Sequence, residues 1–280
     1  MALIEIQNIS KAFGARHVLE NVNLTVEEGE LVSVVGYTGS GKSTLISIVA
    51  GLLRADSGQI LIRGAKSNGF PARASIVFQN YSLLPWFSAM ENVRLAVDAN
   101  FPSWSREKQR EQAARYLEMV GLGNAFDKRP SQLSGGMRQR VAIARSFAIE
   151  PEILFMDEPF GALDALTRAN LQQELAKLCS AAGRQVTMIM ITNSVQEAIL
   201  LSDRIVPMTR GPRATLGPAI SVELERPRLS SQLLRDEKAV RIQSRVVEFL
   251  TGFTHGAKPP REGKAPANRM ARVRSAEAEI

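Results

Sequence analysis

GYTGSGKST, at residues 36–44, has the spacing of a phosphate-binding loop. Residues 31–35 before it form a short apolar run rich in β-branched side chains, and residues 42–53 have the pattern of a helix. A strand, a glycine-rich loop and a helix in this order are the context that a phosphate loop requires. A glycine- and serine-rich turn could match this spacing by chance, but the flanking pattern disfavours that reading.

The residues of this loop suit a nucleoside triphosphate and Mg²⁺. Its backbone amides can surround the β-phosphate, and the helix that follows presents its positive end to the anion. Lys42 is expected to reach the β- and γ-phosphates, and the hydroxyl of Ser43 is expected to bind Mg²⁺. The predicted nucleotide-binding residues of the loop are Gly36, Thr38, Gly39, Ser40, Gly41, Lys42, Ser43 and Thr44.

The rest of the chain alternates between strand and helix patterns, which favours an α/β fold with a parallel sheet. A helical pattern from residue 90 to about 147 interrupts the alternation and indicates an inserted helical subdomain. Strands are predicted at residues 3–7, 22–26, 59–62, 75–78, 153–156, 186–191 and 205–206, and helices at 106–120, 166–182 and 234–250.

Composition excludes several classes of protein. The longest apolar run, residues 45–53, is far shorter than the roughly 18 residues that cross a bilayer. The first residues carry no secretory signal pattern, so we expect a cytoplasmic location. Cys179 is the only cysteine, which excludes an intramolecular disulfide and a cysteine-cluster metal site. Much of the net charge of +7 lies in residues 258–274, whose composition favours a solvated tail over a lipid-binding segment.

Three polar residues that end predicted strands are candidates for catalysis. Asp157 can hold the magnesium shell from across the nucleotide, and Glu158 suits a general base for the attacking water. An Asp-Glu pair in isolation is more typical of a helix cap or a solvated loop. In a chain that also has a phosphate loop, the pair is better explained by a catalytic role. Gln79 could touch both the metal and the water, or could be an ordinary surface glutamine.

These features in combination resemble the ATP-binding-cassette (ABC) ATPases from Leu3 to about Leu224. The motifs are the phosphate loop, Gln79, LSGGMRQ at residues 133–139, Asp157-Glu158 and ALD at residues 162–164. The resemblance implies a P-loop NTPase core with an N-terminal antiparallel β subdomain and a helical subdomain inserted at about residues 84–150. It implies one ATPase domain over residues 1–224, a helical extension over 225–253 and a basic tail over 254–280.

The resemblance also implies roles for individual residues. Phe13 would stack on adenine, and Mg²⁺ would be held by Ser43, Gln79 and Asp157. Ser134, Gly135 and Gly136 would face the γ-phosphate of ATP held by a second cassette, with Asp164 at the contact between the two subunits. Ser134 is also suited to cap the helix that follows it, which would present bare glycine amides to an anion.

Asn193 departs from the family pattern, because the family usually has a histidine after this strand. An asparagine can donate a hydrogen bond to the γ-phosphate or accept one from water, but it cannot carry a proton or a positive charge. We therefore predict slower or partner-dependent hydrolysis at the site that this chain binds.

A single cassette without membrane helices is expected to be the energising subunit of a transporter. The gap of about fifty residues between Gln79 and the Ser-Gly-Gly motif is too short for a long coiled coil. The segment from Gln79 to Phe87 resembles the surface on which importer ATPases receive a helix of the membrane permease. Its aromatic residues, Tyr81, Trp86 and Phe87, could instead pack inside the helical subdomain, but Pro85 favours a surface loop.

LLPW at residues 83–86, DEPFGALD at 157–164 and LSDRI at 201–205 resemble the nitrate, sulfonate and taurine importer branch. Within this branch, Asn193 and residues 207–218 resemble the nitrate/nitrite-type ATPases more than the taurine ones. We expect an ATPase at the cytoplasmic face of the cell membrane, acting indirectly with a substrate-binding protein and not with nucleic acid. The alternative function is a regulatory cassette that hydrolyses ATP poorly beside an active partner. The sequence leaves open whether the two cassettes form a homodimer or a heterodimer. A P-loop kinase or GTPase would not explain residues 133–139.

Overall fold

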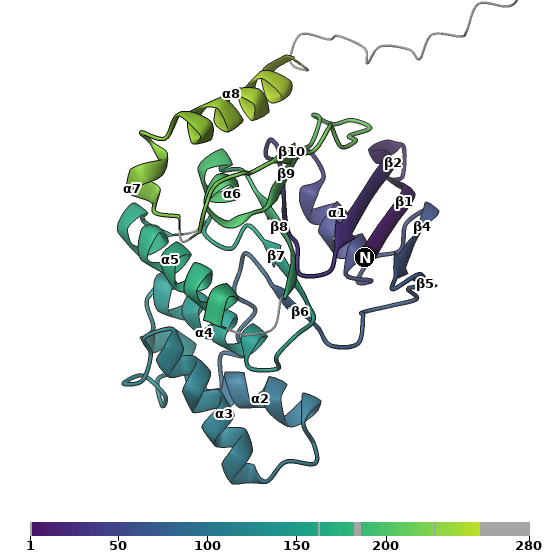
Figure 1. The fold of residues 1–280 in the computed structure, drawn as a ribbon. Coiled ribbons are helices and arrows are strands. Elements are labelled where there is room, and N and C mark those ends of the chain that lie inside the picture. The colour runs from purple at the N-terminus through teal and green to yellow at the C-terminus, as the bar shows by residue number, and fades with distance from the viewer. Residues whose placement is uncertain (1, 162, 182–185, 227, 253–280) are drawn as a thin grey trace, which may run out of the picture.

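A six-stranded sheet carries the phosphate loop at the centre of the molecule (Figure 1). The computed structural model describes residues 2–252 apart from 162, 182–185 and 227, so the predicted tail at 254–280 lies outside the described residues. The strand order is β10-β9-β3-β8-β7-β6, with β10 antiparallel at one edge and the other pairs parallel. Its members are β3 (Leu31–Val35), β6 (Ala74–Val77), β7 (Ile153–Asp157), β8 (Thr187–Thr192), β9 (Arg204–Pro207) and β10 (Ile220–Ser221).

This sheet confirms the predicted α/β core. All five residues of β3 are buried, as expected for the apolar run before the phosphate loop, because helices or strands cover both of its faces. The strands predicted from residues 75, 153, 186 and 205 onward are all present, with ends shifted by at most one residue.

A second, antiparallel sheet faces the first across helix α1 (Lys42–Val49), as Figure 1 shows. The buried side chains of Ile4, Ile46 and Ile191 belong to one core that joins the two sheets through this helix. The sheet has the order β2-β1-β4-β5, and its strands are β1 (Ala2–Phe13), β2 (Arg16–Glu27), β4 (Ser57–Ile62) and β5 (Ala65–Lys66).

The predicted helix 42–53 is too long, because α1 ends at Val49. Gly51 has φ 71°, in the left-handed region, and a Cβ there would lie 2.1 Å from the carbonyl oxygen of Gly69. The backbone of the loop after β5, at Gly69, therefore approaches so closely that only glycine fits at position 51. The helix ends before Gly51.

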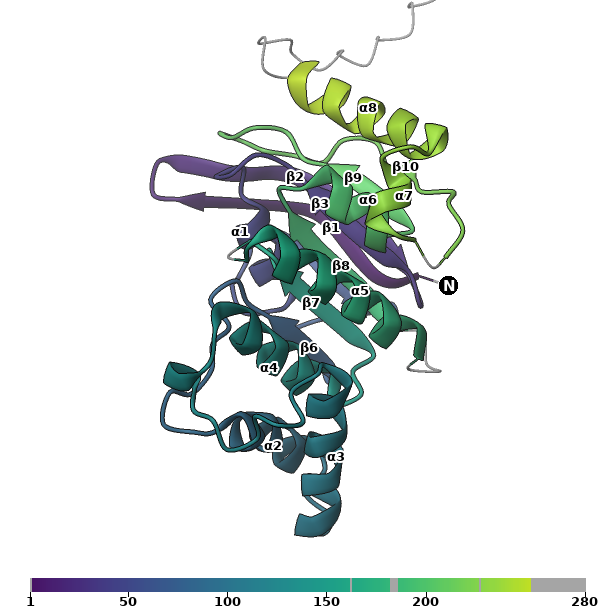
Figure 2. The same ribbon diagram turned by 90° about the vertical axis from the view of Figure 1, so that its left-hand side faces the viewer.

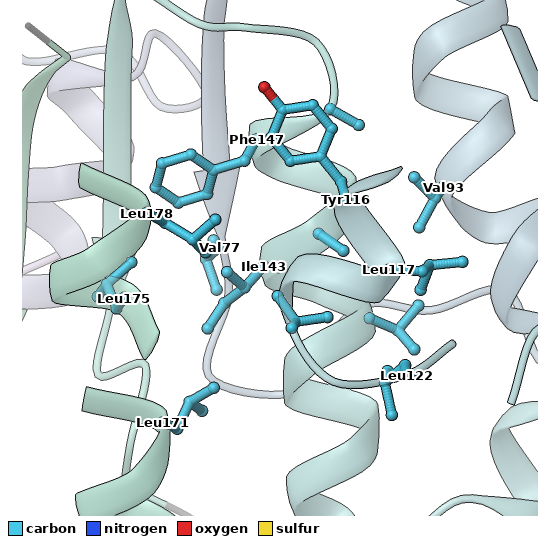
Figure 3. Close-up of a cluster of buried hydrophobic side chains, with 14 of the residues drawn as sticks. Val77, Val93, Tyr116, Leu117, Leu122, Ile143, Phe147, Leu171, Leu175 and Leu178 are labelled. Carbon is cyan, nitrogen blue, oxygen red and sulfur yellow. The ribbon is translucent and has the colours of Figure 1, made fainter. Parts of the chain in front are cut away.

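The inserted helices stand at one end of the molecule, beyond β6 (Figure 2). They are α2 (Ala89–Asn100), α3 (Arg106–Met119), the short 3₁₀ helix η1 (Pro130–Gln132) and α4 (Gly135–Phe147), and they lie next to α5 (Ala165–Ala181). Figure 3 shows their shared core, in which Tyr116 and Ile143 lie among the same buried side chains as Leu171 and Leu175 of α5. The helical layer therefore shares its core with the main sheet through α5.

The C-terminal helices cover the opposite end of the molecule (Figures 1 and 2). They are α6 (Val195–Leu201), α7 (Ser230–Leu233) and α8 (Glu237–Gly252). Ile242 and Val246 of α8 are buried against Ala198 of α6. The helix predicted from residue 234 begins at Glu237, because the side chain of Asp236 accepts a hydrogen bond from the backbone N–H of Ala239, at 3.0 Å, and caps it.

Arg228 fastens this C-terminal segment to α6. Its side chain is buried, with 7% exposed, and it donates hydrogen bonds to the carbonyls of Ile199, Ser202, Val222 and Leu224 at 2.6–3.2 Å. Burial lowers the pKa of Arg228 to about 10, so the guanidinium stays charged at neutral pH.

Every helix among the described residues is too short or too polar to cross a membrane.

Candidate nucleotide site

The predicted catalytic residues meet because three parallel strands end at the same edge of the sheet. Val35 of β3 pairs with Thr192 of β8, and Ile191 of β8 pairs with Asp157 of β7. The loops that follow these strands therefore open side by side, and they carry Lys42, Glu158 and Asn193.

Lys42 occupies the centre of this edge. Its Nζ donates to the carbonyls of Gly36 at 3.0 Å and Tyr37 at 2.9 Å, and to Oδ1 of Asn193 at 2.6 Å. It also lies 3.7 Å from Oε1 of Glu158. Burial lowers the pKa of Lys42, and the negative charge of Glu158 acts in the opposite direction. The cation is thus held by the loop and by both neighbouring strand ends.

Ser43 and Asp157 place two oxygen ligands together beside Lys42. The hydroxyl of Ser43 donates to Oδ1 of Asp157 at 3.1 Å, and burial raises the pKa of this carboxyl. Hard oxygen donors of this kind are the ligands that Mg²⁺ prefers, with substrate phosphates completing the set. No cluster of three His, Cys, Asp or Glu suited to a metal occurs within the described residues.

Asn193 bridges the cation and the candidate base. Its Oδ1 accepts from Lys42, while its Nδ2 donates to Oε1 of Glu158 at 2.9 Å. Glu158 has φ 44°, in the left-handed region, and its backbone N–H donates to the carbonyl of Ile191 at 2.9 Å. This strained turn directs the carboxylate toward the ends of β3 and β8 rather than along its own strand.

Gln79 lies on the other side of Glu158. A Cβ placed on Gly161 would lie 3.5 Å from Nε2 of Gln79 and 3.6 Å from Oε2 of Glu158, so the amide and the carboxylate face the same glycine. Gln79 is thus beside the candidate base, although the structure gives no direct bond between them.

Phe13 lies at the tip of the hairpin formed by β1 and β2, with 51% of its surface exposed. The same hairpin touches the phosphate loop, because a Cβ on Gly41 would meet side-chain carbons of Val18 at 2.9 Å and Leu19 at 3.1 Å. The exposed Phe13 ring, over which Nζ of Lys11 lies at 5.4 Å from the ring centre, belongs to a hairpin that contacts the phosphate loop.

Ser134 caps helix α4 as predicted, since its Oγ accepts from the backbone N–H of Met137 at 3.3 Å. Gly136 is buried where α4 crosses α5, and a Cβ there would lie 2.3 Å from Cγ2 of Thr167. Asp164 caps α5, because its Oδ1 accepts from the N–H of Thr167 at 3.0 Å, and these bonds lower the pKa of Asp164. Gly136 and Asp164 therefore contact the same residue.

Ser134 and Asp164 do not belong to the cluster around Lys42. Among the hydrogen bonds and ion pairs of the described residues, none joins them to Lys42, Ser43 or Glu158. They lie on the surface around α4 and α5, where a second molecule could reach them.

A buried polar linkage behind Asn193 was not predicted. Glu197 accepts from Oγ1 of Thr192 at 2.5 Å and from Nε2 of Gln172 at 3.3 Å, and its Oε1 lies 3.8 Å from Nε of Arg168. Arg168 in turn donates to the carbonyls of Phe160 and Leu163. Burial raises the pKa of Glu197. The linkage connects the turn that holds Asn193 to the loop before Asp164, and a single glutamate in the sequence gives no signal for it.

The loop from Gln79 to Phe87 is held on the protein surface. The guanidinium of Arg145 donates to the carbonyls of Tyr81 and Ser82, both of which have positive φ. Trp86 is 63% exposed, and its ring meets that of Phe87 edge to face at 6.4 Å. Trp86 therefore does not pack inside the helical layer.

Comparisons with known proteins agree with this geometry. A family model described as ABC transporter matches residues 19–161. Bicarbonate transport ATP-binding protein CmpD of Synechocystis sp. is 43% identical over 91% of each chain. Bicarbonate transport ATP-binding protein CmpC of the same organism is 42% identical over 88% of this chain and 38% of its own length. Nitrate import ATP-binding protein NrtD of Synechococcus elongatus is 45% identical over 83% of this chain and 84% of its own.

Solved structures of an ABC transporter cassette are also similar to this chain. The dimeric structure of MJ0796, a bacterial ABC transporter cassette, is 33% identical with a TM-score of 0.71, covering 80% of this chain and 100% of that one. A second dimeric structure of that cassette, in a post-hydrolysis state with ADP and Pi, has a TM-score of 0.70 at 32% identity, with the same coverage.

Proposed function

Since the chain belongs to the ABC transporter family of ATPases, we propose that it is the ATP-hydrolysing subunit of an importer for a small inorganic anion such as nitrate or bicarbonate. The convergence of Lys42, Ser43, Asp157 and Glu158 at one sheet edge supports hydrolysis at this site. The names of the similar proteins favour nitrate or bicarbonate over a sulfonate, although an ATPase subunit need not touch the cargo.

The proposed reaction is attack of water on the γ-phosphorus of ATP, which breaks the bond between that phosphorus and the β–γ bridging oxygen. Residues 36–44 hold the phosphates through their amides, and Lys42 turns from the carbonyls of Gly36 and Tyr37 toward them. Glu158 orients the water and receives its proton. Ser43, Asp157 and Gln79 would hold a Mg²⁺ ion, which would supply positive charge to the phosphates.

Asn193 has a supporting role in this mechanism. In the structure it holds both Lys42 and Glu158, so it must release at least one of them for the lysine to reach the phosphates. Its amide then donates to the γ-phosphate but offers no positive charge to the transition state. This supports the slow or partner-dependent hydrolysis expected from the sequence.

Asn193→His is therefore expected to raise the ATPase rate of the assembled complex about tenfold, the size of one added charge-assisted hydrogen bond in the transition state. The measurement is phosphate release at saturating ATP and Mg²⁺. Asn193→Gln keeps a neutral amide and is the matched control, for which no rise is expected. An unchanged rate in Asn193→His would show that this position does not limit hydrolysis.

We propose that two cassettes close over ATP, with Ser134, Gly135, Gly136 and Asp164 of each facing the nucleotide of the other. The dimeric state of the MJ0796 cassette supports pairing of this kind. CmpC and CmpD are two bicarbonate transport ATP-binding proteins of one organism that both resemble this chain, which favours a heterodimer. Copurification with a second, different cassette would support it, and recovery of a self-pair alone would reject it.

The proposed docking site for the membrane permease is the loop from Gln79 to Phe87, at the cytoplasmic face of the cell membrane. An exposed Trp86 on a loop held in place by Arg145 is suited to receive a partner helix. A substrate-binding protein would act on the far side of the permease, without touching this chain.

Adding the permease subunits is expected to stimulate the ATPase several-fold, and Trp86→Ala is expected to remove most of this stimulation, since an aromatic anchor contributes about 2 kcal/mol or more. The rate is compared with and without the reconstituted permease. Leu234→Ala, which removes an equally exposed apolar side chain from the segment between α7 and α8, is the control and should keep the stimulation. A wild-type rate that does not respond to the permease would contradict the transport function and favour a regulatory cassette.

A further inference from the structure

Tyr37 and Arg210 form a stacked pair beside the phosphate loop. Tyr37 is the second residue of that loop, and Arg210 lies in the loop after β9. The guanidinium carbon of Arg210 lies 3.8 Å from the centre of the Tyr37 ring, which is a close distance for a cation–π contact. Arg213 in the same loop pairs with Glu20 at 3.0 Å, whereas no carboxylate of the described residues lies within ion-pairing distance of Arg210.

The loop that carries Arg210 is fixed by the rest of the fold. The backbone N–H groups of Arg213 and Ala214 donate to the carbonyls of His17 and Val18 in β2, at 3.1 and 2.9 Å. The N–H of Thr209 donates to the carbonyl of Thr215 at 2.9 Å and closes the loop on itself. Backbone hydrogen bonds therefore fix the position of the loop that carries Arg210.

The same segment packs directly on the phosphate loop. The hydroxyl of Ser40 donates to Sδ of Met208 at 3.7 Å, and a Cβ on Gly36 would lie 3.2 Å from Cβ of Met208. A cavity of about 370 Å³ remains between the two loops, lined by Tyr37, Thr38, Gly39, Ser40, Arg210 and Gly211. The Tyr37 residue thus borders open space, and the guanidinium of Arg210 stacks on its ring.

Tyr37 matters because its carbonyl organises the loop. This one oxygen accepts from Nζ of Lys42 at 2.9 Å and from the backbone N–H of Ser40 at 3.2 Å. A shift of the backbone at Tyr37 would therefore disturb the hydrogen bonds that set the shape of the phosphate loop before ATP binds.

We propose that Arg210 is a positioning residue for nucleotide binding, which acts by stacking on Tyr37 and thereby holds the phosphate loop in the open arrangement that ATP enters before Lys42 turns toward the phosphates. The proposal rests on the nucleotide site described above. Arg210 acts through the tyrosine ring, so its effect belongs to nucleotide affinity and not to the chemical step.

The test is a double-mutant cycle on the dissociation constant of ATP, measured by titration of the full chain with a fluorescent ATP analogue and Mg²⁺. Arg210→Ala and Tyr37→Leu are each expected to weaken binding about two- to fivefold, the range of an exposed cation–π contact. In the Tyr37→Leu background, Arg210→Ala should cause no further loss, because the ring through which it acts is gone. In the assembled complex the effect should appear in KM and not in kcat.

A matched control separates this role from others. Arg213→Ala removes an equal charge from the same loop and should bind ATP as the wild type does. Melting temperatures show whether each variant is folded. Equal losses from Arg210→Ala with and without the Tyr37 ring would mean a direct charge effect and would overturn the proposal, as would wild-type affinity in Arg210→Ala. Failure of the wild type to bind ATP would instead overturn the nucleotide site itself.

Discussion

Glu158→Gln is expected to lower the ATPase rate of the assembled complex by about 10²- to 10⁴-fold, the usual contribution of a general base. The neutral amide keeps the size of the side chain and can remain beside Asn193, but it cannot take a proton from water. Phosphate release at saturating ATP and Mg²⁺ measures the effect. ATP binding should persist, so the variant should accumulate as an ATP-loaded pair of cassettes.

Glu152→Gln is the matched control, because Glu152 immediately precedes the same strand, β7, and pairs with Arg73 at 2.6 Å away from the phosphate loop. Its rate should stay close to that of the wild type. A Glu158→Gln complex with more than a tenth of the wild-type rate would exclude Glu158 as the base. A variant that stays monomeric with ATP, even beside its permease and partner cassette, would contradict the proposed pairing.

Arg228→Ala is expected to lower the free energy of unfolding by about 3 kcal/mol, as is typical when a buried hydrogen-bonded charge is removed. The change leaves the carbonyls of Ile199, Ser202, Val222 and Leu224 without this donor. Urea unfolding followed by circular dichroism measures the loss.

Arg226→Ala tests whether any arginine in this segment has the same effect. Arg226 is about one-third exposed and pairs with Asp203 at 2.7 Å, so its removal should cost below about 1 kcal/mol. Equal destabilisation by the two substitutions would show that the buried position of Arg228 does not matter.

The sequence was sufficient to predict the parts of the site that depend on local spacing. The phosphate loop follows a buried strand, and Asp157 and Glu158 follow another, so the parallel sheet brings them together as expected. The cap by Ser134 was also predictable, since a serine before a glycine-rich helix start is a local signal. The roles of Ser134, Gly135, Gly136 and Asp164 toward a second cassette stay predictions, because they concern another molecule.

The parts that were not predicted depend on contacts between distant segments. The helix after the phosphate loop ends early because Gly69 approaches Gly51, and no pattern within residues 42–53 encodes that approach. Helix α6 has only seven residues, too few to show a clear periodicity. The anchoring by Arg228 and the stacking of Arg210 on Tyr37 join residues that nothing in the linear sequence pairs.

The bridge made by Asn193 has a further consequence for how the site responds to acidity. An imidazole at this position would change its charge between about pH 5 and 8, whereas a carboxamide does not ionise in that range. The side chain that joins Lys42 to Glu158 is therefore one that stays neutral across this pH range. Modest acidification of the surrounding compartment does not change the charge of residue 193 itself.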